Sequence, residues 1–97
     1  MGQLLYGVSP ASFDLDDRTL AHVELVVLAK LRRNESFALV LTRPDSSRTT
    51  LWLHPSSVLQ FEYAVGQHEI NREWLDQLVD TANSPGGMRV LPEPAAT

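Results

Sequence analysis

The chain has 97 residues and a formal net charge of −4, with 12 acidic and 8 basic residues. A chain of this length forms one domain, and its 43% hydrophobic and 21% charged residues are typical of a globular protein and argue against disorder. No cysteine is present, which excludes disulfides, thiolate catalysis and cysteine-ligated zinc sites.

Neither a signal peptide nor a membrane span is visible in the sequence. The first ten residues lack a basic region followed by a long apolar run. No apolar run approaches the roughly 20 residues that a transmembrane helix needs. We therefore expect a soluble cytoplasmic protein that does not bind a membrane.

Two short strands and a long helix are expected in the first third of the chain. Alternating apolar residues predict strands over 3–8 and 12–15, and the longest helical pattern runs from Asp16 to Asn34. Asp16 or Asp17 suits the helix N-cap, and the cations at the far end complement the helix dipole. Apolar residues occupy so much of the helical wheel that we expect a largely buried helix, covered on more than one side.

The polar residues of this helix fall into two groups. The clearest polar strip holds His22, Lys30 and Arg33, with Val26 in its midst. Glu24 instead falls within the apolar arc, where a carboxylate needs a partner because burying a bare charge costs several kcal/mol. Glu24 is therefore a candidate for a buried ion pair or for a position at the rim of the core. Its candidate partners are Arg43, Arg48 and Arg72.

Three further strands are expected in quick succession, over residues 35–42, 49–54 and 58–65. The connections between them are short and rich in turn residues, which predicts an antiparallel three-stranded meander. Matching the apolar faces places Leu41 opposite Leu51 and Leu51 opposite Phe61. This apolar face is where the long helix is expected to pack.

A second helix and a short strand complete the predicted domain. Residues 71–83 form an amphipathic helix capped by Asn71, and 88–91 form a last strand. The predicted fold is α+β in the order β-β-α-β-β-β-α-β. It forms a single domain over 1–91, followed by a flexible tail over 92–97.

The other face of the meander is too apolar for a surface that only meets water. Trp52 lies there between Val40 and Gln60, so this face is either covered or a binding surface. Together with the surplus apolar surface of the long helix, it predicts a non-enzymatic interaction module that forms a homodimer. The candidate interface residues are Val26, Val40, Trp52, His54 and Val58.

The alternative function is a nucleic-acid-binding accessory protein that uses the basic helix end. Its candidate anion contacts are Lys30, Arg32, Arg33, Arg43 and Arg48. The competing interpretation is that these charges complement the helix dipole, with their aliphatic stems over apolar surface. The acidic net charge favours the competing interpretation, since phosphate binding needs a basic excess.

No cofactor or metal site is predicted. His54 and Ser56 are candidates for a small hydrolase, but hydroxyls in turns commonly bond the turn backbone instead. His22 and Glu24 point to different sides of a helix and cannot share a metal ion. His68 has no second ligand pair at a recognisable spacing, and no glycine-rich phosphate loop opens a helix.

Several stretches together resemble a family of short, uncharacterised actinobacterial proteins, often labelled "ATP-dependent DNA ligase". These stretches are DDRTLAH, KLRRNESF, LWLHPS, NREWLDQL and ANSPGGMRVLPEP. The resemblance implies a bacterial cytoplasmic setting and a shared fold, but it lends no catalytic residue. A nucleotidyl-transfer ligase needs a Lys-x-Asp-Gly nucleophile, whereas Lys30 is followed by Leu31, Arg32 and Arg33.

Overall fold

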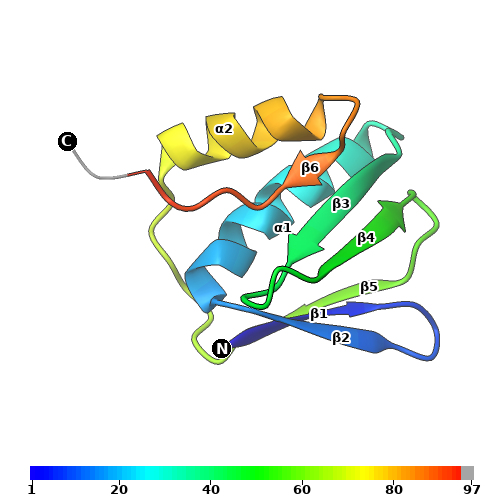
Figure 1. Ribbon diagram of the computed structural model, residues 1–97, viewed down its shortest axis with the longest axis horizontal. Helices are drawn as coiled ribbons and strands as arrows, with labels where there is room; N and C mark the ends of the chain where they lie inside the picture. Colours follow the sequence, from blue (N-terminus) through cyan, green and yellow to red (C-terminus); the bar gives the residue numbers. More distant parts are fainter. Residues whose placement is uncertain (95–97) are drawn as a thin grey trace.

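The computed structural model describes residues 1–94 and shows a mixed α+β fold with two helices and two small sheets (Figure 1). The elements follow in the order β1 (Gly2–Tyr6), β2 (Ala11–Leu15), α1 (Asp17–Arg32), β3 (Phe37–Thr42), β4 (Arg48–Leu53), β5 (Leu59–Glu62), α2 (Arg72–Ala82) and β6 (Met88–Arg89). One sheet has the strand order β2-β1-β5 and the other β4-β3-β6. All neighbours are antiparallel except β3 and β6, which are parallel.

The expected three-stranded meander is wrong, because β5 leaves the β3–β4 hairpin and pairs with β1. Leu4 lies opposite Phe61, and Tyr6 lies opposite Leu59. The alternation of β1 matches that of β4, so demanding that apolar faces coincide does not choose between these two partners. Within the hairpin, Leu51 lies opposite Leu39 rather than Leu41. A shift of two residues keeps the same side chains on the inner face.

Helix α1 begins at a cap and anchors a distant loop with its first residue. The Asp16 carboxylate accepts a hydrogen bond from the Thr19 amide at 3.3 Å, as an N-cap does. The neighbouring Asp17 carboxylate is buried and accepts the Val65 amide at 2.9 Å. This amide bond is the main cause that lowers the pKa of Asp17. The helix start thereby fixes the loop that follows β5.

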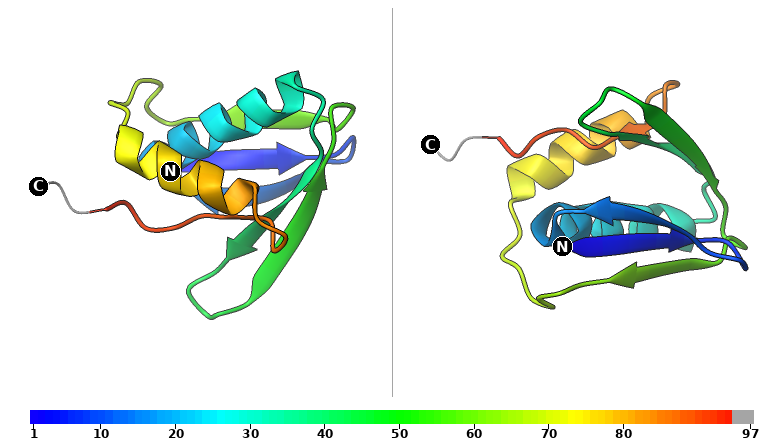
Figure 2. Two further views of the ribbon diagram at one scale, coloured as in Figure 1. Left: turned by 90° about the horizontal axis from the view of Figure 1, so that it is seen from above. Right: turned by 60° about the horizontal axis from the view of Figure 1, so that its bottom comes forward.

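Helix α1 is only partly buried, although a largely buried helix was expected. Seven of its 16 residues are buried. Leu25 is 45% exposed and lies on an open edge of the helix. His22, Val26 and Lys30 form a strip that we expected to face solvent. All three residues are buried instead. Figure 1 shows α1 between α2 and β1, and the left view of Figure 2 shows α1 toward one edge of the molecule.

Helix α2 packs through the stripe expected from the sequence and then leads into β6. Trp74, Leu78 and Ala82 are its buried residues, and the Trp74 indole donates to the Leu91 carbonyl at 2.9 Å. Gly87 allows the turn into β6 because it has a positive φ of 87° and its Cα lies against Ala38. No helix within residues 1–94 is both long and apolar enough to cross a bilayer.

Candidate functional site

Exposed apolar side chains gather at one end of the molecule. Trp52 in β4 is 59% exposed, and Val58, just before β5, is 55% exposed. The Tyr6 hydroxyl donates to the Trp52 carbonyl at 2.8 Å, and the Gly7 amide donates to the Val58 carbonyl at 3.0 Å. These bonds bring in the β1–β2 turn, where Val8 is 88% exposed. We call Val8, Trp52 and Val58 the end patch.

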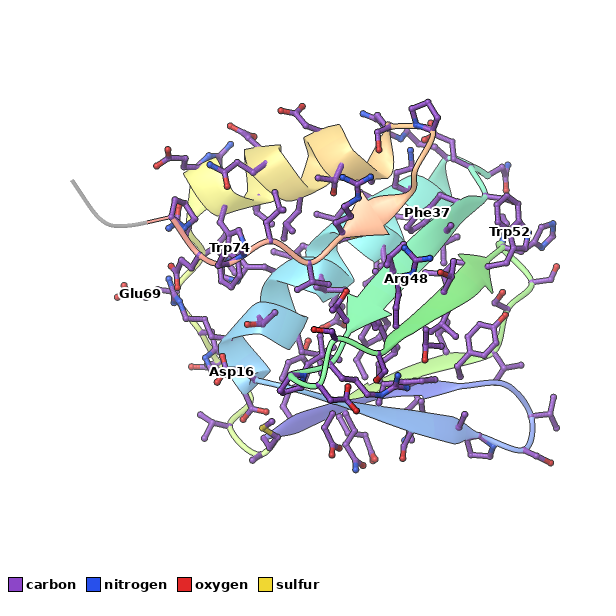
Figure 3. All side chains as sticks on the ribbon, in the orientation of Figure 1. Asp16, Phe37, Arg48, Trp52, Glu69 and Trp74 are labelled. Atoms are coloured by element: carbon purple, nitrogen blue, oxygen red, sulfur yellow. The ribbon has the colours of Figure 1, made fainter. Side chains whose placement is uncertain are left out.

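The end patch lies in chain segments without formal charge. Residues 6–13 and 49–61 contain no Asp, Glu, Lys or Arg, although the whole chain has 20 such residues. Figure 3 shows Trp52 at the opposite end of the long axis from Asp16 and Glu69. Trp52 also lines a small cavity that contains the paired Lys30. Large exposed apolar side chains are typical of an interaction surface.

The structure places most, but not all, of the predicted interface residues at the surface. Three of them are exposed, namely Trp52, His54 and Val58. Val40 is half-buried, and Val26 is only 3% exposed. The prediction for Val26 is wrong because α2 covers the strip that looked like the solvent face of α1.

The His54 turn is held together by its own polar groups. The Ser56 amide donates to His54 Nδ1 at 3.0 Å, and the His54 amide donates to Ser57 Oγ at 3.0 Å. The Ser57 amide completes the turn by donating to the His54 carbonyl at 2.8 Å. These bonds match the turn role expected for the hydroxyls. Within the described residues 1–94, no carboxylate orients the imidazole through Nδ1, as a catalytic triad requires.

The predicted anion contact at Lys30 is wrong because this ammonium group is buried. Lys30 is 6% exposed, and its Nζ donates to Asn83 at 2.7 Å and pairs with Glu35 at 3.0 Å. It also lies 5.6 Å from the centre of the Phe37 ring. Arg33 pairs with the same Glu35 at 3.4 Å. The Lys30 hydrogen bond is the main cause that lowers the pKa of Glu35.

Arg43 and Arg48, the other two predicted anion contacts near the β3–β4 loop, line a cavity together with a third arginine that was not predicted as a contact. Arg43 and Arg48 line one cavity of about 780 Å³ together with Arg89 from β6. We call this cavity the arginine groove. Its other lining residues are Met1, Ser12, Phe13, Asp14, Leu15, Val40, Leu41, Thr42, Pro44, Val90 and Leu91. Arg32 lies outside the groove, exposed at the end of α1.

Comparison with known protein families identifies the family of this chain. A family model described as "Domain of unknown function (DUF7882)" matches residues 1–93. The chain belongs to this family. No curated protein and no solved structure matches the chain.

In this DUF7882 domain, Glu24 contacts a tyrosine rather than the expected guanidinium. The Tyr63 hydroxyl donates to Glu24 Oε1 at 2.5 Å, and Glu24 is half-buried. Burial and this hydrogen bond to Glu24 raise the pKa of Tyr63 well above its ordinary range. Among residues 1–94, no cation lies within ion-pair distance of Glu24. The predicted buried ion pair of Glu24 is therefore wrong, whereas its half-buried carboxylate agrees with the alternative of a position at the rim of the core.

A buried polar network ties the end of the DUF7882 domain to both helices. His22 is fully buried, donates through Nδ1 to the Arg18 carbonyl at 2.8 Å, and accepts the Asn71 amide at 2.8 Å through Nε2. Its ring packs on Trp74, with 4.4 Å between ring centres. Glu93 joins the network through Arg18 Nη2 at 2.7 Å, which lowers the pKa of Glu93 to about 2.

The contacts of Glu93 extend beyond the domain end expected at Leu91. Residues 95–97 of the expected tail lie outside the described part of the chain. Within residues 1–94, no group of three or more His, Cys, Asp or Glu side chains is placed to hold a metal ion.

Proposed function

We propose that this protein is a non-enzymatic interaction module that self-associates through the end patch. The observation that carries the proposal is the 59% exposure of Trp52, in a segment that hydrogen bonds link to the segments of the exposed Val8 and Val58. Removing an exposed tryptophan from water stabilises an interface by about 2–4 kcal/mol. Tryptophan is also among the residues that most often dominate binding energy.

A second copy of the chain suits this surface on electrostatic grounds. Each copy carries a formal charge of −4, so two copies repel each other wherever acidic surfaces meet. The chain segments of the end patch carry no formal charge, which allows close approach without that cost. A two-fold symmetric contact would place the same patch on both sides of the interface. Because the patch is small, we expect a weak dimer with a dissociation constant on the order of micromolar.

The test is sedimentation velocity of the wild type and a Trp52→Asp variant over about 5–500 micromolar protein. The wild type is expected to shift from monomer to dimer with increasing concentration, because each copy then buries its end patch. Trp52→Asp is expected to remain monomeric throughout, since it places a charge at the centre of the contact.

Ile70→Asp is the matched control, because Ile70 is 41% exposed and lies outside the end patch. Circular dichroism of each variant establishes that it is folded. A wild type that is monomeric at every concentration would contradict self-association. A wild-type dimer that persists in folded Trp52→Asp would contradict the end patch as its interface.

The nucleic-acid alternative now has weaker support from the arrangement of its residues. Lys30 is buried and Arg33 is paired, so the five candidate contacts do not form a continuous exposed surface. The cytoplasmic setting and the actinobacterial kinship remain part of the proposal and rest on the sequence resemblance.

A further inference from the structure

One wall of the arginine groove is the free edge of a β-strand. Among residues 1–94, strand β2 pairs only with β1 and ends its sheet. Four consecutive residues of β2, Ser12 to Leu15, line the groove. Successive side chains of a strand point to opposite faces. A cavity that touches four consecutive residues therefore borders the strand's hydrogen-bonding edge rather than one of its faces.

The opposite wall contains a second stretch of free strand edge. Strand β6 pairs with β3 only at Leu39 and Val40. The chain then turns away, with the Leu91 amide bonded to the Arg89 carbonyl at 3.1 Å. Leu41 and Thr42 line the groove and, within residues 1–94, have no strand partner on that side.

Three arginines line this groove in an otherwise acidic protein, and the end of the Arg89 side chain lies beside Gly86 in the turn before β6. Among residues 1–94, Arg43, Arg48 and Arg89 have no acidic side chain within ion-pair distance. Arg43 Nη2 donates to the Thr49 hydroxyl at 2.7 Å, a bond that orients the guanidinium without neutralising it. Figure 3 shows Arg48 on the β4-β3-β6 sheet, the sheet that also contains Arg89. Asp14 is the one acidic residue among the lining residues.

The groove also has apolar positions for side chains that point inward. Phe13, Leu15 and Leu41 line the cavity and belong to or pack against the core. An extended strand alternates its side chains, so one that lies here can direct every second side chain to these residues. The intervening side chains then face the arginines.

We propose that the arginine groove binds an extended acidic segment of a partner protein, which adds as a new strand to β2. Backbone hydrogen bonds to β2 supply affinity, and carboxylates of the segment pair with Arg43, Arg48 and Arg89. A strand rises about 3.3 Å per residue, so the Ser12–Leu15 edge matches a segment of about four residues. A lone small anion would leave this backbone edge unused. The proposal goes beyond self-association, because the groove and the end patch share no residue.

The test uses a fluorescein-labelled octapeptide of alternating glutamate and valine, titrated into the intact protein and followed by fluorescence anisotropy at low salt. Arg48→Glu and Arg89→Glu are each expected to weaken binding at least about fivefold, because like charges then face each other. Arg72→Glu is the matched control, since Arg72 is exposed on α2 and does not line the groove. Asp14→Asn is expected to strengthen binding, because it removes the one negative charge among the residues that line the groove.

Two further measurements separate strand addition from simple attraction between charges. A peptide of alternating glutamate and proline keeps the charge but loses the amide hydrogen of every second residue, so it is expected to bind at least about fivefold more weakly. Hydrogen exchange in residues 12–15 is expected to slow when the glutamate–valine peptide is bound.

Each of three outcomes would overturn the proposal. The first is no binding of the glutamate–valine peptide at millimolar concentration. The second is equal binding by Arg48→Glu, Arg89→Glu and the wild type. The third is that a site for small anions is indicated, either by equal binding of the proline peptide or by full displacement by acetate or phosphate at an equal concentration of charge.

Discussion

His22 shows how a single polar residue can organise a small core. Both of its ring nitrogens have backbone partners, from Arg18 one turn earlier and from Asn71 at the cap of α2. A fully buried imidazole without these partners would cost about 1–3 kcal/mol per unsatisfied group. The ring therefore fixes where α2 begins relative to α1, which no apolar residue of the same size would do.

Glu93 provides a pH-dependent test of this network at the residue scale. Its pKa is lowered from 4.5 to about 2, mainly by the hydrogen bond from Arg18. A group with a lowered pKa stabilises the folded state fully above its unfolded pKa, and that stabilisation is lost as the pH falls toward the folded pKa. We therefore expect Glu93→Gln to lower the melting temperature at pH 7. The difference from the wild type should shrink steadily as the pH falls from about 5 to 2.

Differential scanning calorimetry at several pH values measures this difference. Glu62→Gln is the matched control, because Glu62 is exposed in β5 and makes no ion pair among residues 1–94. A Glu93→Gln melting temperature equal to that of the wild type at pH 7 would show that the Arg18–Glu93 contact contributes nothing to stability.

At the scale of elements, the turn between α2 and β6 depends on one glycine of a pair. Gly87 has a positive φ of 87°, and a Cβ there would lie 2.9 Å from the Ala38 carbonyl oxygen. A Cβ at Gly86 would meet only the end of the flexible Arg89 side chain. We expect Gly87→Ala to lower the free energy of unfolding by about 1–3 kcal/mol. Gly86→Ala is expected to lower it by less than about 1 kcal/mol. Urea denaturation of both variants checks this, and equal losses would contradict the strain at Gly87.

Local signals in the sequence predicted the helices well and the partners of the strands poorly. The cap expected at Asp16 or Asp17 and the apolar spacing predicted the first helix over 16–34, where α1 occupies Asp17–Arg32. Such signals depend on residues within one turn of each other. The burial of His22 and Lys30 depends instead on Asn71 and Asn83, which are about 50 residues away in sequence. Periodicity alone therefore assigned the strip between them to solvent.

The candidate surfaces were likewise predictable only where they depend on local signals in the sequence. The exposure of Trp52 follows from the alternation within its own strand. Val8 reaches the same end of the molecule because β1 pairs with β5 and the Gly7 amide bonds to the Val58 carbonyl. Arg89 joins Arg48 through the short parallel pairing of β6, whose two residues carry no strand pattern of their own. The end patch and the arginine groove both form through contacts between distant segments. Such contacts cannot be predicted from the pattern of one segment alone.

At the scale of the whole molecule, the division into two sheets rests on the choice that β5 makes between β1 and β4. Because the chain has no cysteine, an engineered disulfide reports this choice without competition. Leu5 lies directly opposite Gln60, so Leu5→Cys with Gln60→Cys is expected to form a disulfide readily under mild oxidation. The expected meander would instead place Trp52 opposite Gln60, which makes Trp52→Cys with Gln60→Cys the matched control. That control pair is expected to stay reduced in the folded protein. Mass spectrometry after alkylation distinguishes the two states, and a disulfide in the control pair alone would return β5 to the hairpin and contradict the two-sheet fold.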